Sequence, residues 1–125
     1  LQQSSAASDV YKRQPLQALT LANDASFMEF VKGLSDRILK DGPTDDAGRV
    51  QFAFRASLSR EPSAIEAEIL QRFVKSQRKH FEADADAAMS AASATRPESS
   101  SVSESAVWTA VARVVLNLDE FITRE

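Results

Sequence analysis

Hydrophobic positions near the start of the chain change from irregular to periodic at Pro15. Residues 1–14, LQQSSAASDVYKRQ, show no hydrophobic period and predict no regular element. Proline is favoured at the first position of a helix, because its missing N–H would be unpaired there in any case. Pro15 and the leucines after it therefore predict a short leading helix over 15–22. Asn23 or Asp24 then offers a side-chain oxygen that caps the next helix.

Two amphipathic helices are predicted after this cap, because apolar residues recur three and four positions apart. The stripe of the first helix consists of Phe27, Val31, Leu34 and Ile38. Gly42-Pro43 ends this helix, and Asp45 and Asp46 place negative charge at the start of the next one, where the helix dipole favours it. The apolar positions of the second helix include Val50, Phe54 and Leu58.

The clearest local signal is the capping box Ser63-Ala64-Ile65-Glu66. Ser63 and Glu66 can each satisfy a backbone N–H that the helix leaves unpaired. The apolar stripe after the box recurs every four residues, with only Gln77 polar: Ile65, Ile69, Phe73, Gln77 and Phe81. Leu70 and Val74 lie beside it. This stripe predicts a long helix to about residue 90, with an alanine-rich end.

A loop and a final helix complete the pattern. Residues 93–103 contain proline and several serines and predict the loop. The apolar positions of the final helix recur at three and four: Val107, Trp108, Val111, Val114, Val115 and Leu118. No stretch alternates as a strand does. The sequence thus predicts an all-α protein, a small helical bundle of about four main helices plus a short leading helix.

Composition narrows the function classes only a little. The length of 125 residues fits one domain, and the net charge of −3 disfavours a nucleic-acid partner, since such domains usually carry a basic surplus. With no cysteine, the segment has no disulfide and no thiolate metal site. No apolar run is long enough to span a membrane.

Candidate chemical sites have simpler structural explanations. His80 and Asp84 lie four residues apart and could share a metal ion, but acids alternating with alanine are typical of a solvated helix face. Asp45 and Asp46 could form a carboxylate pair, yet helix capping explains them. Trp108 could stack a ligand, although helical spacing favours a core position. No catalytic signature is present, so catalysis is left open, and the sequence assigns no catalytic, cofactor-binding or metal-binding residue.

Three separated stretches carry a more specific signal: PLQALTLANDASFMEFVKGLSDRIL, RVQFAFRASLSREPSAIEAEIL and AVWTAVARVVLNLDEFITRE. In this order they resemble the C-terminal domain of unknown function, planctomycete surface domain one, of the large planctomycete cytochrome c-type proteins. The resemblance covers residues 15–125. It implies an exported, extracytoplasmic parent protein whose upstream part carries haem c, with the upstream domains of the same polypeptide as partners. The segment itself then holds no cofactor.

The resemblance carries over no catalytic residue, because the family domain has no established activity. It implies structural roles for its recurrent motifs. Pro15 starts a helix, and Asn23 and Asp24 turn the chain into the next. Two arginines of the middle motif are expected to pair with two acids of the final one, and Asn117 to bond an exposed backbone end. These arginines and acids are Arg55, Arg60, Asp119 and Glu120.

One departure from the family concerns the start of the chain. The stretch SSAASDVYKRQ resembles translated sequencing-adapter read-through on a metagenomic fragment, so residues 1–14 are interpreted as a non-native or disordered prefix. Residues 15–125 are then a C-terminal helical domain, incomplete at its N-terminal side. We expect an uncovered apolar patch around Leu16, Leu19 or the helix of Phe27.

Two functions follow from this interpretation. The first is a helical structural or interaction domain at the C-terminus of a large exported cytochrome c-associated protein. The alternative is part of an extracytoplasmic enzyme, redox or carbohydrate-related, whose active site lies mostly in upstream domains.

Overall fold

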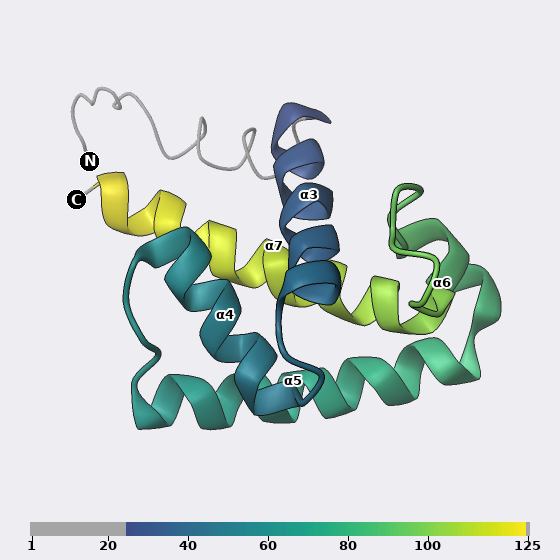
Figure 1. Cartoon of the computed structure of the whole chain (residues 1–125), viewed down its shortest axis with the longest axis horizontal. Coiled ribbons are helices and arrows are strands. Elements are labelled where there is room, and N and C mark those ends of the chain that lie inside the picture. Colours follow the sequence, from purple (N-terminus) through teal and green to yellow (C-terminus); the bar gives the residue numbers. More distant parts are fainter. Residues whose placement is uncertain (1–24, 125) are drawn as a thin grey trace. The chain divides into compact units, whose positions relative to one another are not determined.

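The computed structural model describes the backbone of residues 25–124 and the side chains of residues 25–118 (Figure 1). The predicted leading helix and the motif residues Pro15, Asn23 and Asp24 lie outside the described residues. The chain divides into two units, Leu1–Phe30 and Val31–Glu125. Of the first unit, only residues 25–30, the beginning of a helix, are described, and Phe30 is exposed there.

The described residues contain five helices and no strand, which confirms the predicted all-α class. The helices are α3 (Ala25–Asp41), α4 (Asp46–Leu58), α5 (Ala64–Ala83), α6 (Ala85–Ala91) and α7 (Val102–Arg124). No helix in the described part of the chain is long and apolar enough to cross a lipid bilayer.

Helix α7 is the centre of the second unit, since α4, α5 and α6 each pack against it. Helices α5 and α7 lie side by side and run in opposite directions (Figure 1). Five consecutive residues of α7, Ser105–Thr109, are buried, so this part of the helix is enclosed on all sides. The largest fully buried side chains around it are Trp108, Phe54 and Ile38.

Helix boundaries follow local chemistry. Asp45 caps α4, with its side chain accepting a hydrogen bond from the Gly48 N–H, and Ser59 ends α4 in the left-handed conformation, with φ of 58°. Ser101 begins α7 by accepting from the Glu104 N–H at 3.0 Å. These side chains satisfy backbone groups that the helix ends leave unpaired.

The long helix predicted from Ser63 to about residue 90 is wrong at its end, because the chain breaks at Asp84. Asp84 has extended backbone angles, and its side chain accepts from the Ala87 N–H, so it starts the short helix α6. An aspartate competes for backbone hydrogen bonds in this way and therefore favours caps over helix interiors. The break lets Ala88 of α6 enter the core.

The helix that the apolar stripe predicts is confirmed, but of the stripe itself only Phe81 is buried. Ile65 is 68% exposed and Ile69 is 55% exposed, whereas Leu70 and Val74 are buried. Both sets of residues have helical spacing and converge towards Phe81, which is buried. The core takes the set that faces α4 and α7, which leaves the two isoleucines on the outer side of the helix.

Candidate functional site

An arginine on α5 joins three helices through two carboxylates. Arg78 donates from Nη1 to Asp46 Oδ2 at 2.9 Å and from Nη2 to Asp46 Oδ1 at 3.0 Å. It also donates from Nε to Glu104 Oε2 at 2.7 Å and from Nη2 to Glu104 Oε1 at 3.0 Å. Asp46 is the first residue of α4, and Glu104 lies in the first turn of α7. Two bidentate contacts of this kind fix both the distance and the orientation of their partners.

The same cluster extends to the buried indole of the chain. Trp108 Nε1 donates to Glu104 Oε1 at 3.3 Å, and the Arg49 guanidinium lies 5.6 Å from the centre of the Trp108 ring. Arg49 also approaches Glu104 at 3.5 Å and donates to the Pro43 carbonyl. We call Asp46, Arg49, Arg78, Glu104 and Trp108 the Arg78 clamp.

The charges of the clamp reinforce one another. Hydrogen bonding to Arg78 lowers the pKa of Asp46 and of Glu104 below their ordinary values, although partial burial opposes both shifts. The two carboxylates in turn raise the pKa of Arg78. All three groups therefore stay ionised at neutral pH and direct their hydrogen bonds to each other. Such an arrangement orients helices, and it lacks the neutral carboxyl group that a general acid requires.

A second polar network connects α3 to the loop before α7. Asp36 Oδ2 accepts from the hydroxyl groups of Ser93 and Thr95, and the Ser93 N–H donates to Ser105 Oγ at 2.9 Å. On the adjoining face, Thr109 Oγ1 donates to Ser35 Oγ at 3.2 Å. The other oxygen of Asp36, Oδ1, is buried and has no hydrogen-bond partner among the residues that the structure describes. This network, the Asp36 latch, holds the start of the loop against the helices.

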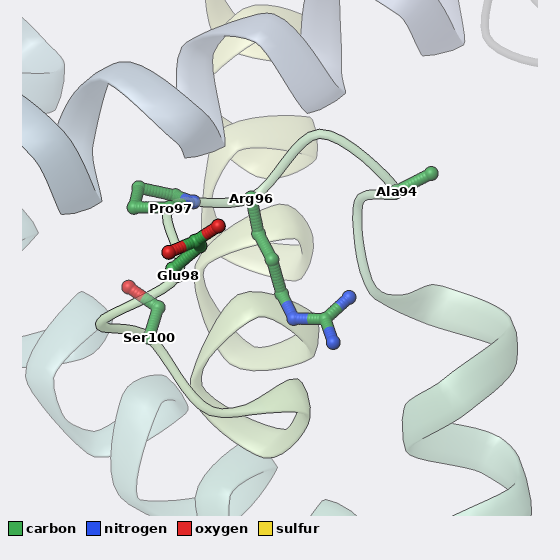
Figure 2. A pocket seen from close by; sticks show the side chains of 5 residues that line it. All are labelled: Ala94, Arg96, Pro97, Glu98 and Ser100. Carbon is green, nitrogen blue, oxygen red and sulfur yellow. The ribbon is translucent and has the colours of Figure 1, made fainter.

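The loop itself is shaped by two turns and borders two shallow pockets. The Arg96 N–H donates to the Ser93 carbonyl, and the Ser100 N–H donates to the Pro97 carbonyl. One pocket, of about 300 Å³, is shown in Figure 2 and is lined by Ala94, Arg96, Pro97, Glu98 and Ser100. There the guanidinium of Arg96 and the carboxylate of Glu98 point in different directions (Figure 2). Arg96 instead donates to the Ser93 carbonyl at 3.3 Å, so the two charges do not converge on one ligand position.

The other pocket, of about 420 Å³, lies beside the latch. Its lining carries both acidic and basic side chains: Asp36, Arg37, Lys40, Asp41, Thr95 and Pro97. Arg37 also covers the Phe52 ring, 5.7 Å from its centre. Both pockets are open to solvent, and the one in Figure 2 is lined mainly by polar surface, unlike the mostly apolar sites that are typical for small molecules.

The third feature is apolar and faces outwards. Ile65 and Ile69 lie one helical turn apart on α5, and the half-buried Phe73 continues the row by another turn. We call these three residues the α5 ridge. The exposed ion pair Glu68–Arg72, at 2.7 Å, runs beside it. Unlike the clamp and the latch, the ridge offers apolar surface that no described part of the chain covers fully.

Comparison with known proteins identifies the family. A family profile matches residues 2–74, which is more than half of the chain. The chain belongs to the PSD1 family, whose members are described as proteins of unknown function (DUF1553). The search of curated proteins gave no match, and neither did the search of solved structures.

The PSD1 match differs in extent from the resemblance drawn from the motifs. It includes most of residues 1–14 and ends within α5. The non-native origin of residues 1–14 stays a prediction. The α5 ridge therefore lies inside the matched residues. Arg78, Glu104 and Trp108 lie outside them.

Two of the predicted motif arginines lie near the α5 N-terminus of this PSD1 chain. Ser63 and Glu66 form the capping box, and Arg60 contacts both oxygens of the Glu66 carboxylate, at 2.8 and 3.0 Å. These contacts lower the pKa of Glu66 to about 2. Arg55 pairs with Glu61 at 2.9 Å on the surface. The described partners are thus close in sequence, whereas the expected partners, Asp119 and Glu120, have side chains outside the described ones.

The other candidate residues of the PSD1 chain lie on α5, on α7 and at the start of α6. Trp108 is fully buried in the core, and Asn117 is exposed on α7. His80 is exposed on α5, while Asp84 caps α6. Within residues 25–118, no group of three or more metal-ligating side chains comes together.

Sequence reasoning missed the clamp and the latch. Arg78, Glu104, Asp36 and Ser93 each look like an ordinary surface residue when considered alone. One signal was available for Glu104, because it stands four residues before Trp108 and therefore on the same side of a helix. Nothing in the local pattern connects Arg78 with Asp46, since that contact depends on how α4 and α5 pack.

Proposed function

We propose that this PSD1 chain is a helical structural and interaction domain. In this proposal it forms the C-terminal end of a large exported protein that also carries a haem-binding, cytochrome c-like domain. The observation that carries the interaction role is the α5 ridge, where two isoleucines remain 68% and 55% exposed on a helix whose other side is firmly packed.

The clamp supports the same role by fixing the helix that carries the α5 ridge. Arg78 ties the second half of α5 to α4 and α7, so the ridge sits on a helix that is held in place at its far end. The capping box and Arg60 hold the near end. Preorganised apolar surface binds with less loss of conformational entropy than surface that must first be ordered.

The resemblance of the three motif stretches supports the exported, extracytoplasmic location and the neighbouring haem domain. The direct check is the coding sequence upstream of Pro15. We expect a signal peptide at its start and a CxxCH motif, the attachment sequence of c-type haem, before this domain. A complete upstream sequence without either feature would contradict the location and the haem partner, and would leave the interaction role standing.

The interaction role is tested by hydrogen exchange on the full-length parent protein. We expect the α5 amides to exchange more slowly in the parent than in the 125-residue chain, because a partner surface covers the ridge. The double substitution Ile65→Glu/Ile69→Glu should remove that difference. Met89→Glu is the matched control, since Met89 is also an exposed apolar residue, 65% exposed, but lies on α6. Equal α5 exchange in both proteins at every concentration tested would contradict the proposal.

Assays on the same parent protein test the alternative that this domain is part of an enzyme. Redox and glycoside turnover would be measured before and after deletion of residues 31–125. Turnover that survives the deletion assigns catalysis elsewhere. Turnover that disappears while the upstream domains stay folded would show that this domain completes an active site, and would overturn a purely structural role.

A further inference from the structure

The loop between α6 and α7 is fastened near its start by polar contacts. We call residues 93–100 the strap. Ser93 is buried, and every other residue of the strap is exposed or half-buried. Ser93 and Thr95 tie the strap to α3 and α7: both hydroxyl groups donate to Asp36 Oδ2, and the Ser93 N–H donates to Ser105 Oγ. A segment with so little buried apolar surface opens at a lower free energy than packed helices do.

The Asp36 latch has fewer protons than its oxygen atoms can share. When the hydroxyl groups of Ser93 and Thr95 both donate to Asp36 Oδ2, no proton is left for the contact between the two hydroxyl oxygens, which lie 3.1 Å apart. Asp36 Oδ1 is buried and has no donor in the described part of the chain. A buried acceptor without a partner costs free energy that is recovered when water reaches it. Hydration of the latch therefore favours the opening of the strap.

The core beneath the latch is polar as well. Among the described residues, the buried polar side chains are those of Ser35, Ser93, Ser105 and Thr109. They are connected, because the Ser93 N–H donates to Ser105 Oγ at 2.9 Å and Thr109 Oγ1 donates to the Ser105 carbonyl at 2.7 Å, with Ser35 Oγ 3.2 Å away. Water that enters beneath the strap thus meets groups that it can hydrogen-bond, whereas in the rest of the core it would meet hydrocarbon.

From these observations we infer that the strap is a lid, which opens as a unit while α3 and α7 stay folded. The closed strap covers the carboxylate of Asp36 and the hydroxyl groups behind it. When the strap opens, the pocket of about 420 Å³ beside the latch loses its wall of Thr95 and Pro97, and Asp36 faces solvent there. The lid is separate from the α5 ridge and does not depend on the interaction role proposed above.

Native-state hydrogen exchange of the 125-residue chain, followed by NMR at low urea concentrations, tests the inference. The Ser93 amide is the reporter, because it is buried and hydrogen-bonded. We expect it to exchange at least about tenfold faster than the amide of Val111 in α7, at a rate that changes little with urea, because opening the strap exposes little surface. Equal protection and equal urea dependence of the two amides would mean that the strap opens only with the whole fold, and would overturn the inference.

A substitution at Thr95 tests whether the latch holds the lid. Thr95 is exposed, and Thr95→Val keeps the shape of the side chain while it removes the hydroxyl group. Losing this hydrogen bond to a carboxylate should raise the exchange rate of the Ser93 amide about tenfold and leave that of Val111 unchanged. Thr95→Ser keeps a hydroxyl group and should match the unaltered chain. Ser99→Ala is the matched control, since it removes another exposed hydroxyl group of the strap.

The variants also define the results that contradict the lid. If Thr95→Val accelerates exchange at Val111 as much as at Ser93, the latch stabilises the whole fold and holds no separate lid. If Thr95→Val has no effect at Ser93, or if Ser99→Ala has the same effect, the latch does not hold the strap closed. Circular dichroism verifies that each variant is folded.

Discussion

Arg78 illustrates how much one residue can organise in a small helical protein. Its guanidinium directs hydrogen bonds to two carboxylates from two other helices, and both partners are about as exposed as Arg78 itself, with side-chain exposures between 27% and 30%. At this depth an ion pair is stronger than on the open surface, yet it is still partly hydrated. The ion pairs of Arg78 therefore orient the three helices as well as stabilise the fold.

Replacing this arginine should destabilise the fold clearly. For Arg78→Gln we expect a loss of about 2 kcal/mol in the free energy of unfolding, because Asp46 and Glu104 keep their charges and lose their partner. Arg55→Gln is the matched control: its pair with Glu61 has side-chain exposures of 51% and 57%, and its loss should cost at most about 1 kcal/mol. Urea unfolding followed by circular dichroism measures both. Equal losses for the two variants would mean that the clamp contributes no more than a surface pair.

The same residues predict how stability depends on pH. Asp46, Glu66 and Glu104 have pKa values lowered by their arginine partners, with that of Glu66 at about 2. A carboxylate whose pKa is lower in the folded state contributes stability that is fully present above its unfolded pKa and is lost as the pH falls through the folded pKa. We therefore expect the free energy of unfolding to decline from about pH 4.5 towards about pH 2.

Urea titrations at a series of pH values check this decline. In Arg78→Gln the slope should be shallower, because the pKa values of Asp46 and Glu104 return towards their ordinary values. A wild-type curve that stays flat over this range, or rises, would contradict the assignment of these carboxylates.

At the scale of elements, local chemistry is predictable from the sequence and the choice of packing face is not. The capping box at Ser63 can be identified from the sequence because both of its partners lie within one turn. Helix α5, however, carries two neighbouring rows of apolar residues, one through Ile65 and Ile69 and the other through Leu70 and Val74. Periodicity alone cannot select between them, because either row makes an amphipathic helix. Only the neighbours α4 and α7 determine which row is buried.

The end of α4 gives a prediction at this scale. Ser59 adopts the left-handed conformation, which costs an L-residue about 1 kcal/mol or more, whereas glycine adopts it freely. Ser59→Gly should therefore stabilise the protein by about 0.5 kcal/mol, after allowance for the greater freedom of glycine in the unfolded chain. Ser59→Val should destabilise it, because a β-branched side chain tolerates this conformation poorly. Thermal unfolding of the two variants checks the order; a Ser59→Val variant as stable as the Ser59→Gly variant would contradict it.

On the scale of the whole molecule, the fold class follows from the sequence and the polar contacts between helices do not. Helical periodicity and the lack of alternating stretches suffice to predict an all-α bundle. The clamp joins residues 32 and 26 positions apart, and the latch joins Asp36 to residues 57 and 59 positions away. Such contacts exist only when segments far apart in the sequence have packed together. The exposure of the α5 ridge is likewise not predictable from the sequence, since it becomes apparent only when the core residues are known.

The position of Trp108 has an optical consequence. It is the only tryptophan of the chain, its ring is fully buried, and its indole N–H donates to the carboxylate that also holds Arg78. Fluorescence emission of the protein therefore arises largely at the point where three helices are tied together. A shift of that emission to longer wavelength reports water entering the clamp, and so separates the opening of this centre from changes elsewhere in the chain without any added label.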